Sequence, residues 1–186
     1  MPYYIYIIIA LIAFLLWEVI AIYNSLVRGR QRVEEEKSNI GTHEKRRYDL
    51  IPNLVETVKG YAGHEKTAFE NVTKARTQAM AAGGSLKEHQ AAENMFTGAL
   101  KSIFALSEAY PDLKANQNFL KLQQDLADTE NNIQEARAAY NAAVRDQNTR
   151  VESFPSDFVA REFRFLKYEF YETGDEASRQ PVSVKF

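Results

Sequence analysis

The feature that most constrains this chain is an apolar run at its start, residues 3–23, which reads YYIYIIIALIAFLLWEVIAIY. As a helix that rises about 1.5 Å per residue, the run spans about 30 Å, the hydrocarbon thickness of a bilayer. A secretory signal peptide is the alternative, but it would carry basic residues before a shorter apolar core and a small-x-small cleavage site. Only Met1 and Pro2 precede the run, and residues 21–24 (AIYN) offer no such site. We therefore interpret residues 1–23 as a retained, single-pass transmembrane anchor.

Aromatic residues lie near both ends of this predicted anchor, where their rings favour the headgroup region of a bilayer. One acidic residue, Glu18, lies inside the run, little more than a turn from its inner end. It either snorkels to the interface or makes a polar contact between neighbouring anchors of an oligomer. The residues that we assign to the anchor and its interface are Tyr3, Tyr4, Tyr6, Trp17, Glu18 and Tyr23.

Basic residues follow the anchor, whereas none precedes it. Arg28, Arg30, Arg32 and Lys37 lie within about 15 residues of its end, the window in which the positive-inside bias acts. We therefore expect the N-terminus outside and the rest of the chain in the cytoplasm. The three arginines are also close enough to the bilayer, within about one or two Debye lengths of roughly 10 Å, to contact lipid headgroups.

The composition and the motifs exclude several classes of function. The chain has no cysteine, so neither disulfides nor thiolate metal sites are expected, and its net charge of −2 gives no attraction to nucleic acid. His64 and Glu65 begin a zinc-protease motif, but Ala68 stands where the second histidine is required. We expect no catalytic residues, no metal and no cofactor, and we interpret the acid-rich helix faces as solvated surface.

The chain beyond the anchor has the period of long helices. One apolar stripe runs through Ile40, Ile51, Leu54, Val55, Val58 and Ala62, and Pro52 is expected to kink this first helix rather than end it. A second helix is predicted from about residue 64 to 80. Ser85 and Glu88 form a capping box for a third helix, which ends before Pro111. Either Asp112 or Asn116 caps the fourth.

The fourth helix, from about residue 116 to 154, has the clearest pattern. Its apolar residues alternate spacings of three and four, typical of coiled-coil packing: Phe119, Leu122, Leu126, Thr129, Ile133, Ala136, Tyr140, Ala143, Gln147, Val151 and Phe154. Such a helix is about 58 Å long and needs long partners. The predicted fold is all-α: the anchor (1–23), an elongated antiparallel four-helix bundle (24–155), and an aromatic C-terminal segment with a short extended tail (156–186).

The aromatic segment, residues 158–172 (FVAREFRFLKYEFYE), allows three arrangements. It can fold back over its own bundle, lie on the membrane through its basic residues, or dock on a neighbouring protomer. We favour docking among the functional arrangements, with residues 181–186 (PVSVKF) extended as a strand-like strap. The candidate oligomer-interface residues are Phe158, Phe163, Phe170, Val182, Val184 and Phe186.

Several segments, in order, resemble the LemA family. The first is residues 45–55 (KRRYDLIPNLV), and the match continues through 109–116 (AYPDLKAN), 119–120 (FL), 129–131 (TEN), 140–141 (YN), 154–156 (FPS) and 181–186. The sequence departs from the family where Lys37 precedes residues 38–40 (SNI), a position that often carries Trp, and at residues 42–44. The resemblance implies a bacterial inner-membrane protein with a helical bundle and no established enzymatic activity. Some relatives take part in building magnetosome membranes, and others are encoded near a membrane metallopeptidase linked to envelope stress.

Our first hypothesis is a non-catalytic, self-assembling scaffold that organises or remodels membrane or recruits partners. Its expected partners are membrane lipid and further copies of the chain. The alternative is a regulatory adaptor of a membrane protease or of an envelope-stress pathway, in which the bundle binds one client. A hydrolase or metalloenzyme is a third reading, which bound metal or turnover of generic substrates would support.

Overall fold

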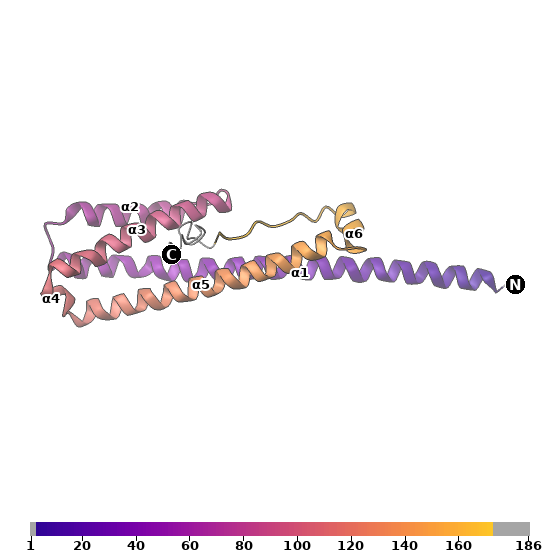
Figure 1. The fold of residues 1–186 in the computed structure, drawn as a ribbon, viewed down its shortest axis with the longest axis horizontal. Coiled ribbons are helices and arrows are strands. Elements are labelled where there is room, and N and C mark those ends of the chain that lie inside the picture. Colours follow the sequence, from indigo (N-terminus) through magenta and orange to yellow (C-terminus); the bar gives the residue numbers. More distant parts are fainter. Residues whose placement is uncertain (1–2, 173–186) are drawn as a thin grey trace, which may run out of the picture.

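A computed structural model describes residues 3–172 of the chain. These residues form helices and connections, with no strand among them (Figure 1). The elements are α1 (Tyr4–Lys59), α2 (Lys66–Ala81), α3 (Leu86–Ala109), α4 (Pro111–Lys114), α5 (Gln117–Glu152) and α6 (Ser156–Glu162). The predicted all-helical class is confirmed, and the predicted strand-like tail lies outside the described residues.

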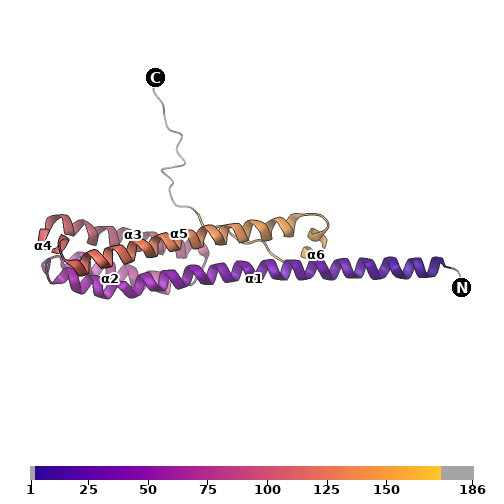
Figure 2. The ribbon, with the colours of Figure 1, turned by 90° about the horizontal axis from the view of Figure 1, so that it is seen from below.

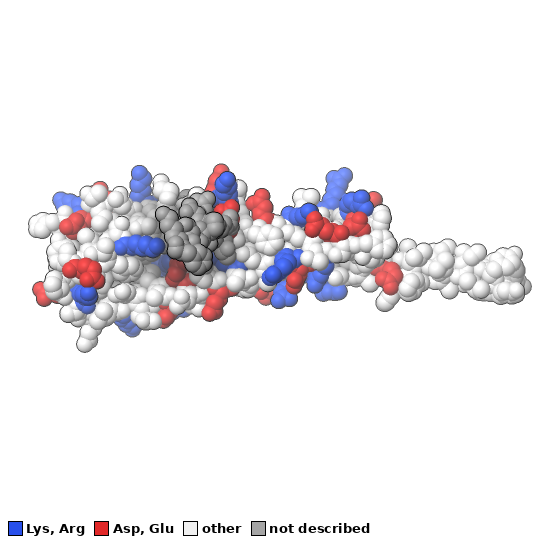
Figure 3. Space-filling view, in the orientation of Figure 1, with Lys and Arg blue, Asp and Glu red and all other residues white. Residues whose placement is uncertain are grey.

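Helix α1 is the axis of the molecule. It runs for 56 residues without a break, through Pro52, and its N-terminal part extends well beyond every other element (Figures 1 and 2). Within residues 3–172 it is the one helix long and apolar enough to cross a membrane by length and composition, and none of its most apolar stretch is buried. The protruding part shows no Lys or Arg in Figure 3, whereas charged side chains cover the bundle.

The bundle has two levels along this axis. Far from the N-terminus, α1, α2, α3 and α5 enclose a core that includes Leu54, Val72, Phe96 and Phe119. Nearer the N-terminus, α2 and α3 have ended, because 16 and 24 residues cannot match the 36 residues of α5. There α1 packs mainly against α5, around Val33, Ile40, Tyr140 and Val144 with Tyr171 added from the C-terminal segment, and then against α6.

The helix ends follow the predicted caps. Ser85 Oγ accepts from Glu88 N–H at 3.3 Å while the Glu88 carboxylate accepts from Ser85 N–H at 3.1 Å, which confirms the capping box of α3. Asn116, rather than Asp112, caps α5, because its Oδ1 accepts from Phe119 N–H at 3.0 Å. Residues 111–114 form the short α4, which Pro111 begins at a position where the missing N–H costs nothing.

One member of the predicted α5 stripe is placed wrongly. Phe119, Leu126, Ile133, Tyr140 and Gln147 are buried, but the side chain of Phe154 is 81% exposed. Helix α5 ends at Glu152, and the backbone of Ser153 is extended, so the chain leaves the helical path before it reaches Phe154. The 3.6-residue period therefore no longer determines which way this ring points.

The aromatic C-terminal segment folds back over its own bundle as far as residue 172. After α6, residues 165–172, here called the return segment, run in an extended conformation along α5 (Figure 1). Asn148 donates to the Tyr168 carbonyl and accepts from its N–H, both at 2.9 Å. Asn141 pairs in the same way with Tyr171, at 3.0 and 2.9 Å. Two asparagines, two helical turns apart, thus satisfy the backbone that an isolated extended segment would expose.

Candidate functional site

The main concentration of buried charge lies inside the bundle, where α1, α3 and α5 meet. Glu44, Arg47 and Glu93 are 2–3% exposed, although charged side chains are seldom so buried unless paired. Arg137 of α5 approaches them from one side, and His89 of α3 from another. We call these five residues the polar cluster.

Helical geometry places the polar cluster inside the bundle. On α1, Glu44, Arg47 and Tyr48 fall between Ile40 and Ile51 on one stripe, at spacings of three and four residues. On α3, Glu93 stands one turn before the buried Phe96, and His89 stands one turn earlier still. Polar residues at these positions must enter the core with their apolar neighbours.

Arg47 ties three helices together. Its guanidinium donates to Glu93 of α3 and to Glu130 of α5, and its carbon lies 5.1 Å from the centre of the Phe96 ring. The Tyr48 hydroxyl donates to the other oxygen of Glu93. Burial raises the pKa of the Glu93 carboxyl, and the Arg47 guanidinium opposes that shift. Because Arg47 and Glu93 are nearly inaccessible to water, each depends on the other for its charge to be tolerated.

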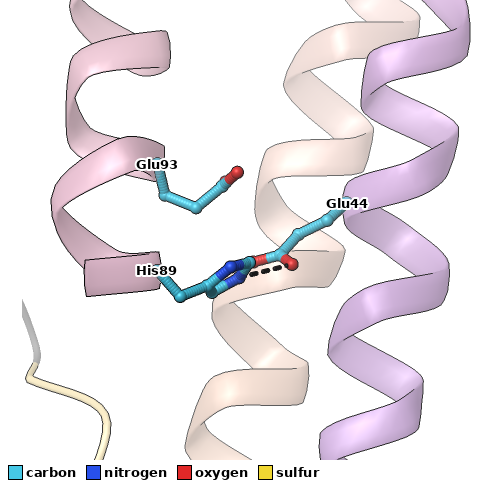
Figure 4. Close-up of side chains that lie close together, drawn as sticks. All are labelled: Glu44, His89 and Glu93. Carbon is cyan, nitrogen blue, oxygen red and sulfur yellow. Dashed lines mark hydrogen bonds and ion pairs between the residues drawn. The ribbon is translucent and has the colours of Figure 1, made fainter. Parts of the chain in front are cut away.

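The ring of His89 joins three elements, and Figure 4 shows its contact with Glu44. Its Nε2 lies 2.9 Å from a Glu44 carboxylate oxygen, and its Nδ1 lies 3.2 Å from the carbonyl of Ala82, just after α2. A carboxylate and a carbonyl both accept, so only a doubly protonated imidazolium satisfies both contacts. Consistently, the hydrogen bond to Glu44 raises the pKa of His89. With His89 charged, Arg47, Arg137 and His89 balance Glu44, Glu93 and Glu130.

Three members of the polar cluster have the spacing of a metal site. One ligand atom from each of Glu44, His89 and Glu93 lies within 4.8 Å of the others (Figure 4). The same carboxylates, however, pair with two guanidinium groups: Arg47 bonds Glu93, and Arg137 lies 3.4 Å from Glu44. A divalent cation would have to displace these fixed positive charges and the proton on His89. The donor set therefore fits an ion-pair network better than a metal centre.

Sequence reasoning missed the polar cluster, because it interpreted the charged helix faces as solvated surface. A signal was nevertheless available. Glu44 and Arg47 interrupt an apolar stripe at core positions, and Glu93 does the same on α3. A charge at a position whose neighbours one turn away are apolar predicts a buried pair, although it does not identify the partner.

The predicted anchor residues lie on the protruding part of α1. Tyr3, Tyr4, Tyr6 and Trp17 are 57–80% exposed, and Glu18 is partly buried. Tyr23 differs, because its ring packs edge-on against Phe163 and Phe165 with centroids 4.9 and 5.8 Å away. Tyr23 therefore contacts residues of the C-terminal segment, although part of its ring stays exposed. The described structure brings the base of the apolar stretch against the segment after α6.

The predicted headgroup arginines, Arg28, Arg30 and Arg32, are all exposed just beyond this base. Arg30 lies over the ring of Phe165 at 5.6 Å. Of the candidate oligomer-interface residues, Phe158, Phe163 and Phe170 are 49–59% exposed although the segment that carries them folds back on its own bundle. The remaining candidates, Val182, Val184 and Phe186, lie outside the described residues.

A shallow groove runs between α3 and α5 beside the polar cluster. One stretch, of about 500 Å³, is lined by polar residues that include Lys87, Gln90 and Arg137. The next, of about 490 Å³, is lined largely by Leu100, Phe104 and Leu126. The groove exists because α3 packs mainly on α2 and α5 mainly on α1.

Comparison with known proteins gives one family. The LemA family model matches residues 36–186. The magnetosome protein MamQ of Magnetospirillum gryphiswaldense is 23% identical over 80% of this chain and 64% of its own length. Magnetosome protein MamQ 2 of Paramagnetospirillum magneticum is 24% identical over 81% and 64%. Protein LemA of Metamycoplasma hominis is 23% identical over 82% and 69%. The chain thus covers slightly less than two thirds of the length of the MamQ relatives.

Proposed function

We propose that this chain, which belongs to the LemA family, is a membrane-anchored, non-catalytic scaffold that assembles with copies of itself. Its place is the bacterial inner membrane, where it organises or remodels membrane or recruits partners. The observation that carries this proposal is the continuity of α1. One unbroken 56-residue helix contains both the apolar stretch and the part of α1 that packs in the bundle, so continuous helix connects the proposed anchor to the bundle.

The exposed surface of the apolar stretch supports the anchor. Large side chains from Tyr3 to Ile20 are 39–80% exposed on all faces of the helix. Covering each of them is worth about 2 kcal/mol, and contiguous apolar surface on this scale marks contact with lipid or protein. The stretch matches the thickness of a bilayer, and exposed Arg28, Arg30 and Arg32 follow it. The proposed orientation therefore has the N-terminus outside and the bundle in the cytoplasm.

The interior of the bundle supports a structural role. The buried charges of the polar cluster are engaged with one another, and they tie α1, α3 and α5 into one body. Self-association would cover the half-exposed ring of Phe170, and it would give Glu18 a polar neighbour. The name of the MamQ relatives places them at magnetosomes, which supports a part in a larger assembly.

The test uses the full chain extracted in mild detergent. We expect an intact mass that includes residues 1–23, a C-terminal fluorescent fusion that is bright in cells, and oligomers by mass photometry. A chain shortened by loss of the apolar stretch would overturn the anchor, and an active alkaline-phosphatase fusion at the same place would overturn the orientation. Monomers alone would overturn self-assembly.

The groove between α3 and α5 favours a second candidate, a regulatory adaptor for a membrane protease or stress-response protein. Its apolar stretch, with Leu100, Phe104 and Leu126, is open to a client side chain. A photocrosslinker at Thr97, which lines both stretches, tests this candidate. Crosslinks to one membrane protein, from a chain that is monomeric in detergent, would favour the adaptor over the scaffold.

A further inference from the structure

Exposed aromatic rings gather at the end of the bundle that faces the apolar stretch of α1. Phe154, Phe158 and Phe163 are 81%, 59% and 52% exposed, and we call these three residues the aromatic end. The rings of Phe154 and Phe158 pack edge-on with centroids 5.9 Å apart. Helix α6 buries its other side, Val159 and Ala160. The fold therefore buries the face of α6 that carries Val159 and Ala160, and it leaves the phenylalanine rings exposed.

The register of α5 against α1 fixes the height of the aromatic end. The Gln147 amide donates to the Leu26 carbonyl at 3.2 Å, and the Arg150 guanidinium donates to the Ser25 carbonyl at 3.3 Å. The helices are antiparallel, so the chain beyond Arg150 approaches the apolar stretch. Phe163 touches it directly, because its ring centroid lies 4.9 Å from that of Tyr23. The aromatic end thus lies level with the inner edge of the proposed membrane span.

The charges around the aromatic end suit an anionic surface. Residues 24–32 and 150–167 contain seven basic and three acidic side chains, although the chain as a whole carries a net charge of −2. Arg161 lies over the Phe158 ring at 5.0 Å, and Arg30 lies over that of Phe165 at 5.6 Å. When a cation lies over an aromatic ring at a bilayer surface, the ring can lie at the depth of the lipid carbonyls while the cation contacts the phosphates.

We propose that Phe154, Phe158 and Phe163 insert into the headgroup region of the bilayer that holds the anchor, on its anionic cytoplasmic face. The proposal rests on the proposed membrane anchor and adds a second point of attachment. A single helix would let the bundle tilt about the point where α1 leaves the membrane. The aromatic end, carried by α6 and the residues that flank it beside α1, removes that freedom and holds the bundle against the lipid surface.

Trp17 is the single tryptophan of the chain, which allows a direct test. The full chain is reconstituted in vesicles of phosphatidylethanolamine and phosphatidylglycerol, with and without lipid brominated near the headgroup. Native Trp17 reports the anchor. Phe154→Trp and Phe158→Trp, each combined with Trp17→Phe, report the aromatic end. Tyr61→Trp in the same background is the matched control, because Tyr61 is 42% exposed at the opposite end of the bundle.

We expect bromolipid to quench the tryptophans at 154 and 158 at least half as strongly as Trp17 and to leave the control unchanged. Quenched Trp17 with unquenched reporters at 154 and 158 would overturn this proposal and leave the anchor standing. A blue-shifted but unquenched reporter would mean that protein, such as a second copy, covers the aromatic end. An unquenched Trp17 would instead overturn the anchor itself. Circular dichroism of each variant checks that the fold is retained.

Discussion

The substitution Arg47→Met tests the polar cluster most directly. It removes one guanidinium and leaves the carboxylate of Glu93 buried, with its side chain 2% exposed, and without its main partner. Breaking a buried ion pair from one side costs about 3–5 kcal/mol, because the remaining charge loses its partner and has no water to replace it. We expect a loss of that size in the free energy of unfolding.

The outer partner of the same arginine provides the control. Glu130 pairs with Arg47, but its side chain is 37% exposed, and its neutralisation leaves the buried guanidinium paired with Glu93. We expect Glu130→Gln to cost at most about 1 kcal/mol, the range of exposed pairs. The double variant Arg47→Met/Glu93→Leu removes both buried charges, and should recover part of the loss. The double variant cannot recover the whole loss of stability, because the Tyr48 hydroxyl loses its acceptor on Glu93.

The assay is urea unfolding of the full chain in mild detergent, followed by helical circular dichroism and analysed with a common slope. The micelle keeps the apolar stretch helical, so the change in signal comes from the bundle. A cost below about 1 kcal/mol for Arg47→Met would refute the argument, since it would show that water reaches the pair. Equal costs for Arg47→Met and Glu130→Gln would refute it as well.

Three further predictions concern single contacts. The pKa of His89 is raised in the folded chain. The stability that protonated His89 contributes is therefore complete below its ordinary pKa of 6.5 and is lost as pH rises through the folded pKa. His89→Gln should abolish this pH dependence of the free energy of unfolding, measured by urea unfolding. Alanine at both Asn141 and Asn148 removes two pairs of hydrogen bonds, so amide exchange in the return segment should accelerate while exchange in α1 stays unchanged. Ser85→Ala should lower the free energy of unfolding by about 1 kcal/mol and Ser85→Asp much less, because aspartate still caps α3.

The pattern of the polar residues did not predict the interior of the bundle correctly. The acid-rich helix faces were interpreted as solvated surface, whereas Glu44, Arg47 and Glu93 are only 2–3% exposed. A helical stripe shows that a residue faces inward, but the partner that permits a buried charge comes from another helix. Glu93 lies 46 residues after Arg47, and no local rule relates them.

The sequence by itself determined the local features. The capping box at Ser85, the passage of α1 through Pro52, the long α5 and the length of the apolar stretch all follow from residues within a few turns of one another. Each depends on backbone hydrogen bonding and helical period, which short segments encode.

Only the tertiary structure decided the rest. It placed Phe154 outside the core, returned residues 165–172 along α5, and set the aromatic end beside Tyr23. It also left the groove between α3 and α5, because α2 and α3 pack as one pair and α1 and α5 as another. These outcomes depend on the register of α5 on α1 and on the turn after Glu152. The register of one helix on another is set by the sum of many contacts between distant segments, so no local sequence pattern determines it.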